Sequence, residues 1–269
     1  MTGIPLECHR ISFDPDSSRS RGALIILCRR ADADRGSVTV TELRARDRVF
    51  ITVFPGYGQE LRLGQDLDRV LSWLRDYVSA PSPHIGRTGP VCPFVPAALG
   101  DNAIRFSFHY GTDGRDPAGL HALLAGELRE FDRIAEPPGK AGTSLASLLV
   151  VLPDTGPQGW AVMDAAYGGI KEFAVATGLM VGQFHPACDE RAVRNPGFPV
   201  SRAPLGLFAA RRMAPHDILF LHDDAEWFAV YQERFGSHYT RGKVRDPLMR
   251  ELYSNAVREF APAIRSIVT

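Results

Sequence analysis

The sequence predicts an α+β fold, an α/β sandwich in which helices pack on a mixed sheet that follows an antiparallel β meander. Two patterns carry this prediction. Short apolar or alternating segments separated by turns fill the first 54 residues, and beyond residue 100 such segments alternate with longer stretches of helical spacing. We expect a single domain over residues 1–269, with the meander and one helix in residues 1–80, the α/β core in residues 81–269, and the helices on one face of the sheet.

The N-terminal elements follow from short patterns. Residues 24–28 are an apolar run, residues 37–43 alternate, and residues 48–53 are rich in β-branched side chains before the turn at residues 55–58. A helix is predicted over residues 64–78, because leucines and valines recur there at helical spacing and two aspartates lie in its first turn.

The core elements alternate along the chain. A loop rich in proline and glycine, residues 79–99, leads into them, and a loop of that length is often functional. Strands are predicted at residues 104–109, 145–152, 179–184, 205–211 and 218–221, and helices at residues 117–134, 159–177, 225–235 and 247–267. This order predicts one sheet whose strands are connected mainly by helices.

Composition excludes several classes of protein. The 269 residues include 31 basic and 31 acidic ones, so the chain lacks the global positive charge of a non-specific nucleic-acid binder. Its apolar runs are far shorter than the ~20 residues that a membrane helix needs, and no signal-peptide pattern is visible. We therefore expect a cytoplasmic protein that binds neither nucleic acid nor membrane.

Cysteine spacing and motif searches narrow the chemistry further. Cys8, Cys28, Cys92 and Cys188 are scattered without a C-x-x-C pair, which argues against zinc ribbons and thioredoxin-type centres and predicts free thiols in a reducing cytoplasm. The chain also lacks the G-x-G-x-x-G, P-loop, G-x-S-x-G and H-E-x-x-H motifs of dinucleotide dehydrogenases, nucleoside triphosphatases, serine hydrolases and zinc proteases. Two classes of protein remain, one that works with a bound cofactor and one that only binds a ligand.

The stretch from residue 182 to residue 204 is the most informative. A predicted strand brings His185 to its carboxyl end, where ligands gather in α/β sheets, and Pro186 restricts the backbone that holds the imidazole. His185 is therefore a candidate ligand or base, or else a loop histidine with an ordinary hydrogen bond. His185 and Cys188 have the H-x-x-C spacing of two metal ligands, but a zinc site needs three or four, and no second close pair lies nearby.

Arginines are concentrated in and after this stretch, at Arg191, Arg194, Arg202, Arg211 and Arg212. Guanidinium groups suit bidentate recognition of carboxylates or phosphates. The arginines therefore predict an anion site or, where nearby acidic residues pair with them, a structural network of salt bridges.

Two other groups are candidates as well. Cys92 precedes a short helical segment at residues 96–99, and it is either a nucleophile or iron ligand, or a buried inert cysteine. His216, His222 and His238, with acidic residues beside His222, are candidates for a non-haem iron site, although the segment at His222 also fits an acid-capped helix start.

Two segments resemble a family of proteins from bacterial secondary metabolism. Residues 86–96, GRTGPVCPFVP, are similar to its G-R-x-G-x-V-C-P-F-x-P pattern, and residues 182–204 are similar to its G-x-F-H-P pattern with a following R-N-P-x-F and an R-S-P-like turn. That turn reads Ser201-Arg202-Ala203-Pro204 here, which departs from the pattern. Over residues 81–235 the chain looks like a relative of haem-dependent amino-acid N-oxygenases.

The resemblance implies a monooxygenase that uses haem b and an electron donor to N-hydroxylate the side-chain nitrogen of a small amino acid. It implies His185 as the iron ligand, with Arg191, Arg194 and Arg202 near the haem propionates, and His216 or His109 as the distal proton donor. Strand edges of the meander are compatible with a homodimer. The alternatives are a cofactor-free accessory protein that binds an anionic small molecule through the arginine-rich loop, and a non-haem iron enzyme.

Overall fold

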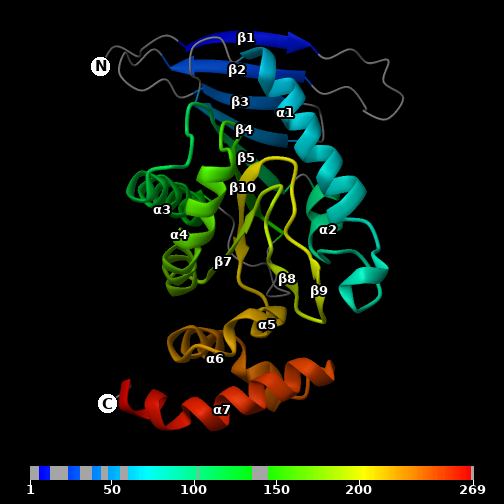
Figure 1. The fold of residues 1–269 in the computed structure, drawn as a ribbon, viewed down its shortest axis with the longest axis vertical. Helices are drawn as coiled ribbons and strands as arrows, with labels where there is room; N and C mark the ends of the chain where they lie inside the picture. The colour runs from blue at the N-terminus through cyan, green and yellow to red at the C-terminus, as the bar shows by residue number, and fades with distance from the viewer. Residues whose placement is uncertain are drawn as a thin grey trace.

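The computed structural model describes residues 6–12, 24–30, 38–43, 48–54, 60–101, 103–134 and 145–267. Within these residues, eight strands form one mixed sheet in the order β1-β2-β3-β4-β5-β6-β10-β7 (Figure 1). Helices pack against the sheet, and the last helices of the chain lie beyond its lower end in that view. The predicted α+β class is confirmed.

The first four strands form the predicted antiparallel meander. They are β1 (Leu6–Ser12), β2 (Leu24–Arg30), β3 (Val38–Leu43) and β4 (Arg48–Phe54). The sequence pattern does not predict β1, because Arg10 interrupts its alternation of apolar and polar residues. β4 pairs in parallel with the next strand, so the meander and the core belong to one sheet.

The core strands build the other half of the sheet. β5 (Ile104–His109) and β6 (Ser147–Leu152) run parallel to β4, β10 (Gly206–Arg212) is antiparallel to β6, and β7 (Leu179–Phe184) lies at the edge, antiparallel to β10. The two crossovers of the parallel part contain helices, as connections between parallel strands usually do.

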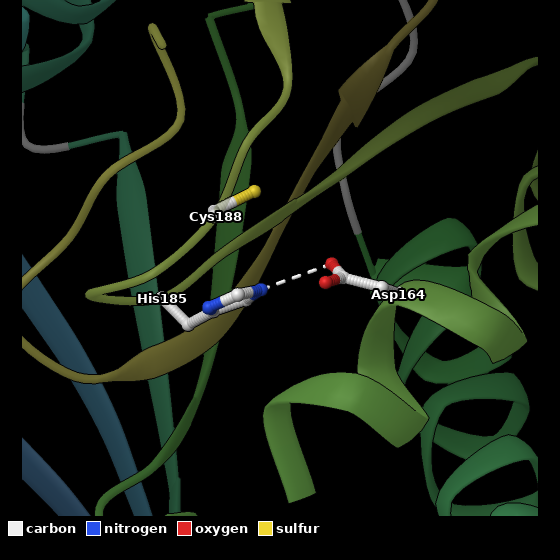
Figure 2. Close-up of side chains that lie close together, drawn as sticks. All are labelled: Asp164, His185 and Cys188. Carbon is white, nitrogen blue, oxygen red and sulfur yellow. Dashed lines mark hydrogen bonds and ion pairs between the residues drawn. The ribbon is translucent and has the colours of Figure 1, made fainter. Parts of the chain in front are cut away.

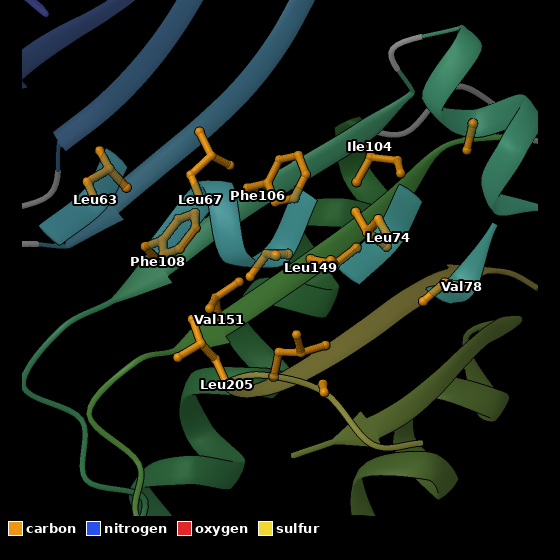
Figure 3. Packing of buried hydrophobic residues seen from close by; sticks show 14 of the residues in the cluster. Leu63, Leu67, Leu74, Val78, Ile104, Phe106, Phe108, Leu149, Val151 and Leu205 are labelled. Atoms are coloured by element: carbon orange, nitrogen blue, oxygen red, sulfur yellow. The ribbon is translucent and has the colours of Figure 1, made fainter. Parts of the chain in front are cut away.

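Helices cover both faces of this half, so the prediction of one covered face is wrong. On β6, Leu149 and Val151 face α1 (Glu60–Trp73), and the cluster that they join is shown in Figure 3. The alternate residues of β6 pack with α3 (Pro117–Ile134) and α4 (Pro157–Ala176) on the other face. The unbroken apolar run of β6 is typical of a strand that is buried on both sides.

A third core joins the C-terminal helices, which are α5 (Ile218–Leu221), α6 (Ala225–Thr240) and α7 (Pro247–Ile267). The strand predicted at residues 218–221 is wrong, because this segment is α5. A four-residue apolar run has no periodicity that separates strand from helix. The preceding 3-10 turn η3 (Pro215–Asp217), closed by a hydrogen bond from the Ala214 backbone to the Asp217 carboxylate, directs the chain into a helix.

The remaining elements are short. The predicted helix over residues 64–78 ends in one π-helical turn, η1 (Leu74–Val78), and the long loop contains η2 (Pro83–Ile85) and α2 (Val95–Gly100). Between β7 and β10, β8 (Arg191–Ala192) and β9 (Asn195–Pro199) form a hairpin. Among the described helices, none combines the length and the apolar character that crossing a membrane requires.

Candidate functional site

The carboxyl end of β7 places two consecutive aromatic side chains on opposite faces of the sheet. Phe184 points towards α1, where its ring meets the Trp73 ring edge-on at 5.4 Å. His185 points towards α4 and is 1% exposed. Because side chains alternate along a strand, the position of Phe184 in the apolar core fixes the direction of His185.

His185 is held by two residues of α4. Its Nε2 lies 2.9 Å from Oδ1 of Asp164, and its ring stacks on the Trp160 ring with centroids 5.6 Å apart and planes 13° apart. Trp160 and Asp164 are four residues apart, so both project from the same face of the helix. The carboxylate and the indole therefore fix both the position and the plane of the imidazole.

Two polar atoms of this stack have no hydrogen-bond partner among the described residues. They are His185 Nδ1 and Trp160 Nε1, and both are buried. Buried polar groups are nearly always hydrogen-bonded, and an exception calls for an explanation such as an ordered water, an ion or a ligand. The stack therefore has unused hydrogen-bonding capacity for a bound group.

Cys188 completes a cluster at the same point. The thiol is buried and lies 3.8 Å from the carbonyl oxygen of Gln183, and one ligand atom each from Asp164, His185 and Cys188 falls within 4.8 Å of the others (Figure 2). Burial, together with the nearby carboxylates of Asp164 and Glu190, raises the pKa of the Cys188 thiol. A cation at the centre of the cluster would reverse this effect and favour the thiolate.

The donor set of this cluster suits a transition metal. Imidazole nitrogen, thiolate sulfur and carboxylate oxygen together favour a borderline ion such as Zn²⁺ or Fe²⁺ over Mg²⁺ or Ca²⁺. Three protein ligands leave a position for water or substrate, as catalytic metal sites do. The Asp164 side chain is 47% exposed, so the cluster is accessible from solvent on that side.

Haem, which the resemblance implies, does not fit at His185 in this arrangement. A porphyrin needs an open layer of space across the bond between iron and the imidazole. Here Asp164 occupies the direction of Nε2, the Trp160 ring covers one face of the imidazole, and Nδ1 is enclosed. The residues at His185 thus accommodate a single ion and not a macrocycle.

The three arginines expected at the haem propionates do not converge. Arg191 pairs with Asp189 at 2.8 Å on the surface, and Arg194 pairs with Asp246 at 2.5 Å, in the loop before α7. Arg202 lines a groove on the α1 side of the chain. Two of the three therefore belong to salt bridges, which is the structural alternative considered from the sequence.

Neither candidate for the distal proton donor is brought to His185. His109 shares its end of the sheet but lies on β5, three strand spacings or about 14 Å away. Its Nε2 is 3.0 Å from both Ser107 Oγ and Glu127 Oε1. His216 follows β10, whose carboxyl end adjoins the start of β7, roughly 20 Å from His185 along the strand.

The later histidines do not form an iron site. His216 packs edge-on against the Phe94 ring, the His222 Nδ1 lies 3.1 Å from the Ile218 carbonyl oxygen, and His238 contacts the Phe235 ring. Among the described residues, the cluster at His185 is the single group of three or more histidine, cysteine or acidic side chains placed to hold a metal.

The two segments that carry the resemblance pack on each other. A Cβ at Gly86 would lie 2.6 Å from the carbonyl oxygen of Arg194, and Asn195 donates a hydrogen bond to the His84 carbonyl at 2.7 Å. Cys92 is partly buried near the Arg211 guanidinium, at the opposite end of β7 from His185. Cys92 and the His185 cluster are therefore separate features.

Sequence reasoning missed Asp164 and Trp160. They precede His185 by 21 and 25 residues, and no motif connects a helix residue to a loop that far along the chain. One signal was present: Trp160, Asp164 and Lys171 are polar or amphipathic residues at helical spacing in a largely apolar helix. Such a stripe marks the side of α4 that faces a polar neighbour.

Comparison with known proteins gives a family for this fold and site. No curated protein and no solved structure matches the chain. The family described as a domain of unknown function, DUF6875, matches residues 67–246, which run from within α1 to the residue before α7 and include Asp164, His185 and Cys188. The chain therefore belongs to the DUF6875 family.

Proposed function

We propose that the protein is a mononuclear iron oxygenase that oxidises an amine-bearing small molecule, with its ion held by Asp164, His185 and Cys188. The observation that carries the proposal is the convergence of three different donor atoms within 4.8 Å of one another, two of them on buried residues. The third ligand, Asp164, comes from α4 and was not predicted from the sequence.

The choice of iron rests on the resemblance to amino-acid N-oxygenases. The donor set alone accepts Zn²⁺ and Fe²⁺ equally well, whereas an N-oxygenation needs a metal that changes oxidation state. The reaction converts R-NH₂, O₂, two electrons and two protons into R-NHOH and water. An external electron donor is therefore part of the proposal.

Each residue of the site has a separate task. His185 supplies a neutral nitrogen donor whose plane the Trp160 ring fixes, and Cys188 loses its proton when the ion binds. Asp164, the most exposed of the three, lies where water or substrate would enter. The bound iron supplies oxygen activation. A cytoplasmic location, which keeps the Cys188 thiol reduced, belongs to the same proposal.

The test is the metal content of the purified chain and of its variants. Anaerobic reconstitution with Fe²⁺, followed by elemental analysis, is expected to give about one ion per chain. His185→Ala, Cys188→Ser and Asp164→Asn are expected to lose it. Asp189→Asn is the matched control, because Asp189 is an exposed carboxylate of the same loop that pairs with Arg191 outside the cluster.

Cobalt substitution separates ligation from general damage to the fold. Co²⁺ bound through a thiolate gives a charge-transfer absorption band, which Cys188→Ser is expected to abolish and Asp189→Asn to retain. A protein that retains iron in Cys188→Ser, or binds none when wild type, would overturn the proposal. A stoichiometric pyridine haemochrome would overturn the single ion in favour of haem b, and zinc alone in freshly purified protein would refute the oxygenase chemistry.

A further inference from the structure

A groove lies across the chain from the His185 cluster, between α1 with η1 and the strand-like segment of residues 198–204. It is a shallow groove, open to solvent, with a volume of about 890 Å³. Its apolar lining comes from Trp73, Tyr77, Phe198 and the prolines 186, 199 and 204. The groove faces α1 whereas His185 faces α4, so the two features lie on opposite sides of the same segment.

Three side chains of α1 and η1 form hydrogen bonds to residues 200–204, which make the opposite wall of the groove. Arg69, Trp73 and Tyr77 are spaced four residues apart and donate hydrogen bonds to the carbonyl oxygens of residues 204, 202 and 200, at 2.9, 2.8 and 2.9 Å. This series holds residues 200–204 parallel to the helix axis. It also uses the indole N–H and the tyrosine hydroxyl, so these rings offer the groove mainly apolar surface.

The charged groups that remain free in the groove have both signs. Among the described residues, no ion pair or hydrogen bond engages the guanidinium of Arg202 or the carboxylates of Asp68 and Asp76. Arg202 lies close enough to Tyr77 to lower the pKa of its hydroxyl, against the larger, raising effect of burial. Asp76 and Arg202 both line the groove, so it presents a free negative and a free positive side chain.

We propose that this groove binds a free aromatic α-amino acid. Arg202 takes the carboxylate through two parallel N–H···O bonds, Asp76 takes the ammonium group, and the ligand ring lies against Trp73 and Phe198. An aromatic zwitterion matches the two features of this groove, which are free charges of both signs and a lining of aromatic rings and prolines. This inference is independent of the metal and of the oxygenase reaction.

The experiment compares three probes on the intact protein by isothermal titration calorimetry. L-phenylalanine carries both charges, phenethylamine lacks the carboxylate, and 3-phenylpropionate lacks the ammonium group. For wild type, L-phenylalanine is expected to bind up to about fivefold more tightly than phenethylamine, because solvent screens a charge pair with the exposed Arg202 side chain.

Arg202→Gln is expected to abolish the preference of the protein for L-phenylalanine over phenethylamine, while Asp76→Asn abolishes its preference over 3-phenylpropionate. Arg75→Gln, an exposed arginine of η1 outside the groove, is the matched control and is expected to retain both. The hydrogen bond that holds the wall at this residue uses the Arg202 backbone carbonyl, and the side chain is exposed, so its replacement is expected to leave the wall in place. No binding of L-phenylalanine to wild type, or equal preferences in wild type and Arg202→Gln, would overturn the proposal. These variants are expected to keep the metal content of wild type, so this test and the test of the metal site can fail separately.

Discussion

Two adjacent arginines at the end of β10, Arg211 and Arg212, allow a comparison of how much a buried and an exposed ion pair contribute to the stability of the fold. The Asp217 carboxylate is fully buried and accepts hydrogen bonds from Arg211 at 2.9 and 2.6 Å and from the Ala214 backbone at 2.6 Å. Arg212 pairs with Asp132, whose side chain is 42% exposed. The two arginines share a strand, and the pairs differ in the burial of the carboxylate and in the hydrogen bonds that accompany it.

Asp217→Ala is expected to lower the free energy of unfolding by about 3 kcal/mol, at the lower end of the range for breaking a buried pair. The lower end applies because Arg211 keeps its place 4.3 Å from the centre of the Phe94 ring and its bond to the Arg212 carbonyl. Asp132→Ala is expected to cost less than about 1 kcal/mol, because solvent screens the exposed pair.

Urea denaturation followed by circular dichroism measures both variants. With a slope of about 3 kcal/mol per molar urea, Asp217→Ala lowers the midpoint by about 1 M, and Asp132→Ala shifts it by less than a third of that. Equal midpoints for the two variants would refute the assignment of this difference to burial.

Three further predictions use the same unfolding assay. Gly86→Ala is expected to destabilise the protein, because Gly86 has φ +74° and an added Cβ would contact the Arg194 carbonyl oxygen; an unchanged midpoint would contradict this packing. Arg194 holds the pKa of Asp246 below its usual range, so Asp246→Asn is expected to lower stability at neutral pH and to match wild type once acid has protonated Asp246. Burial lowers the pKa of Lys171. The free energy of unfolding of wild type minus that of Lys171→Met is therefore expected to rise as the pH increases through that lowered pKa. A decrease in this difference would contradict the prediction.

The fold was largely predictable because its elements carry strong local periodicity. Residues 104–109, 117–134, 179–184 and 247–267 have the predicted type and bounds. The failures have specific physical causes. The run at residues 218–221 is too short to show a period, and the second covered face of the sheet depends on α1 crossing back over strands that come later in the chain, which no local pattern encodes.

The site was predictable only in part, for a similar reason. His185 and Cys188 are close in sequence, so their spacing indicates two ligands, and the structure brings both to one point. The third member, Asp164, comes from the helix that packs beside β7, and its proximity is a consequence of tertiary packing. The arginine cluster shows the opposite error, because closeness in sequence did not bring Arg191, Arg194 and Arg202 together in space.

The unpartnered atoms of the His185 stack allow a test that needs no metal. Trp160→Phe retains an aromatic ring against the imidazole, but it removes part of the indole together with its N–H, which has no partner among the described residues. If nothing binds there, deleting a buried unsatisfied donor is expected to raise the free energy of unfolding of metal-free protein by about 1 kcal/mol, after the smaller ring has lost some packing. If a water or a ligand accepts from that N–H, the substitution removes a real hydrogen bond and destabilises the protein instead. Urea denaturation of the metal-free variant, with Trp227→Phe at another partly buried indole as a control for the lost ring area, distinguishes the two signs. Destabilisation beyond that of the control would show that the stack binds a further group.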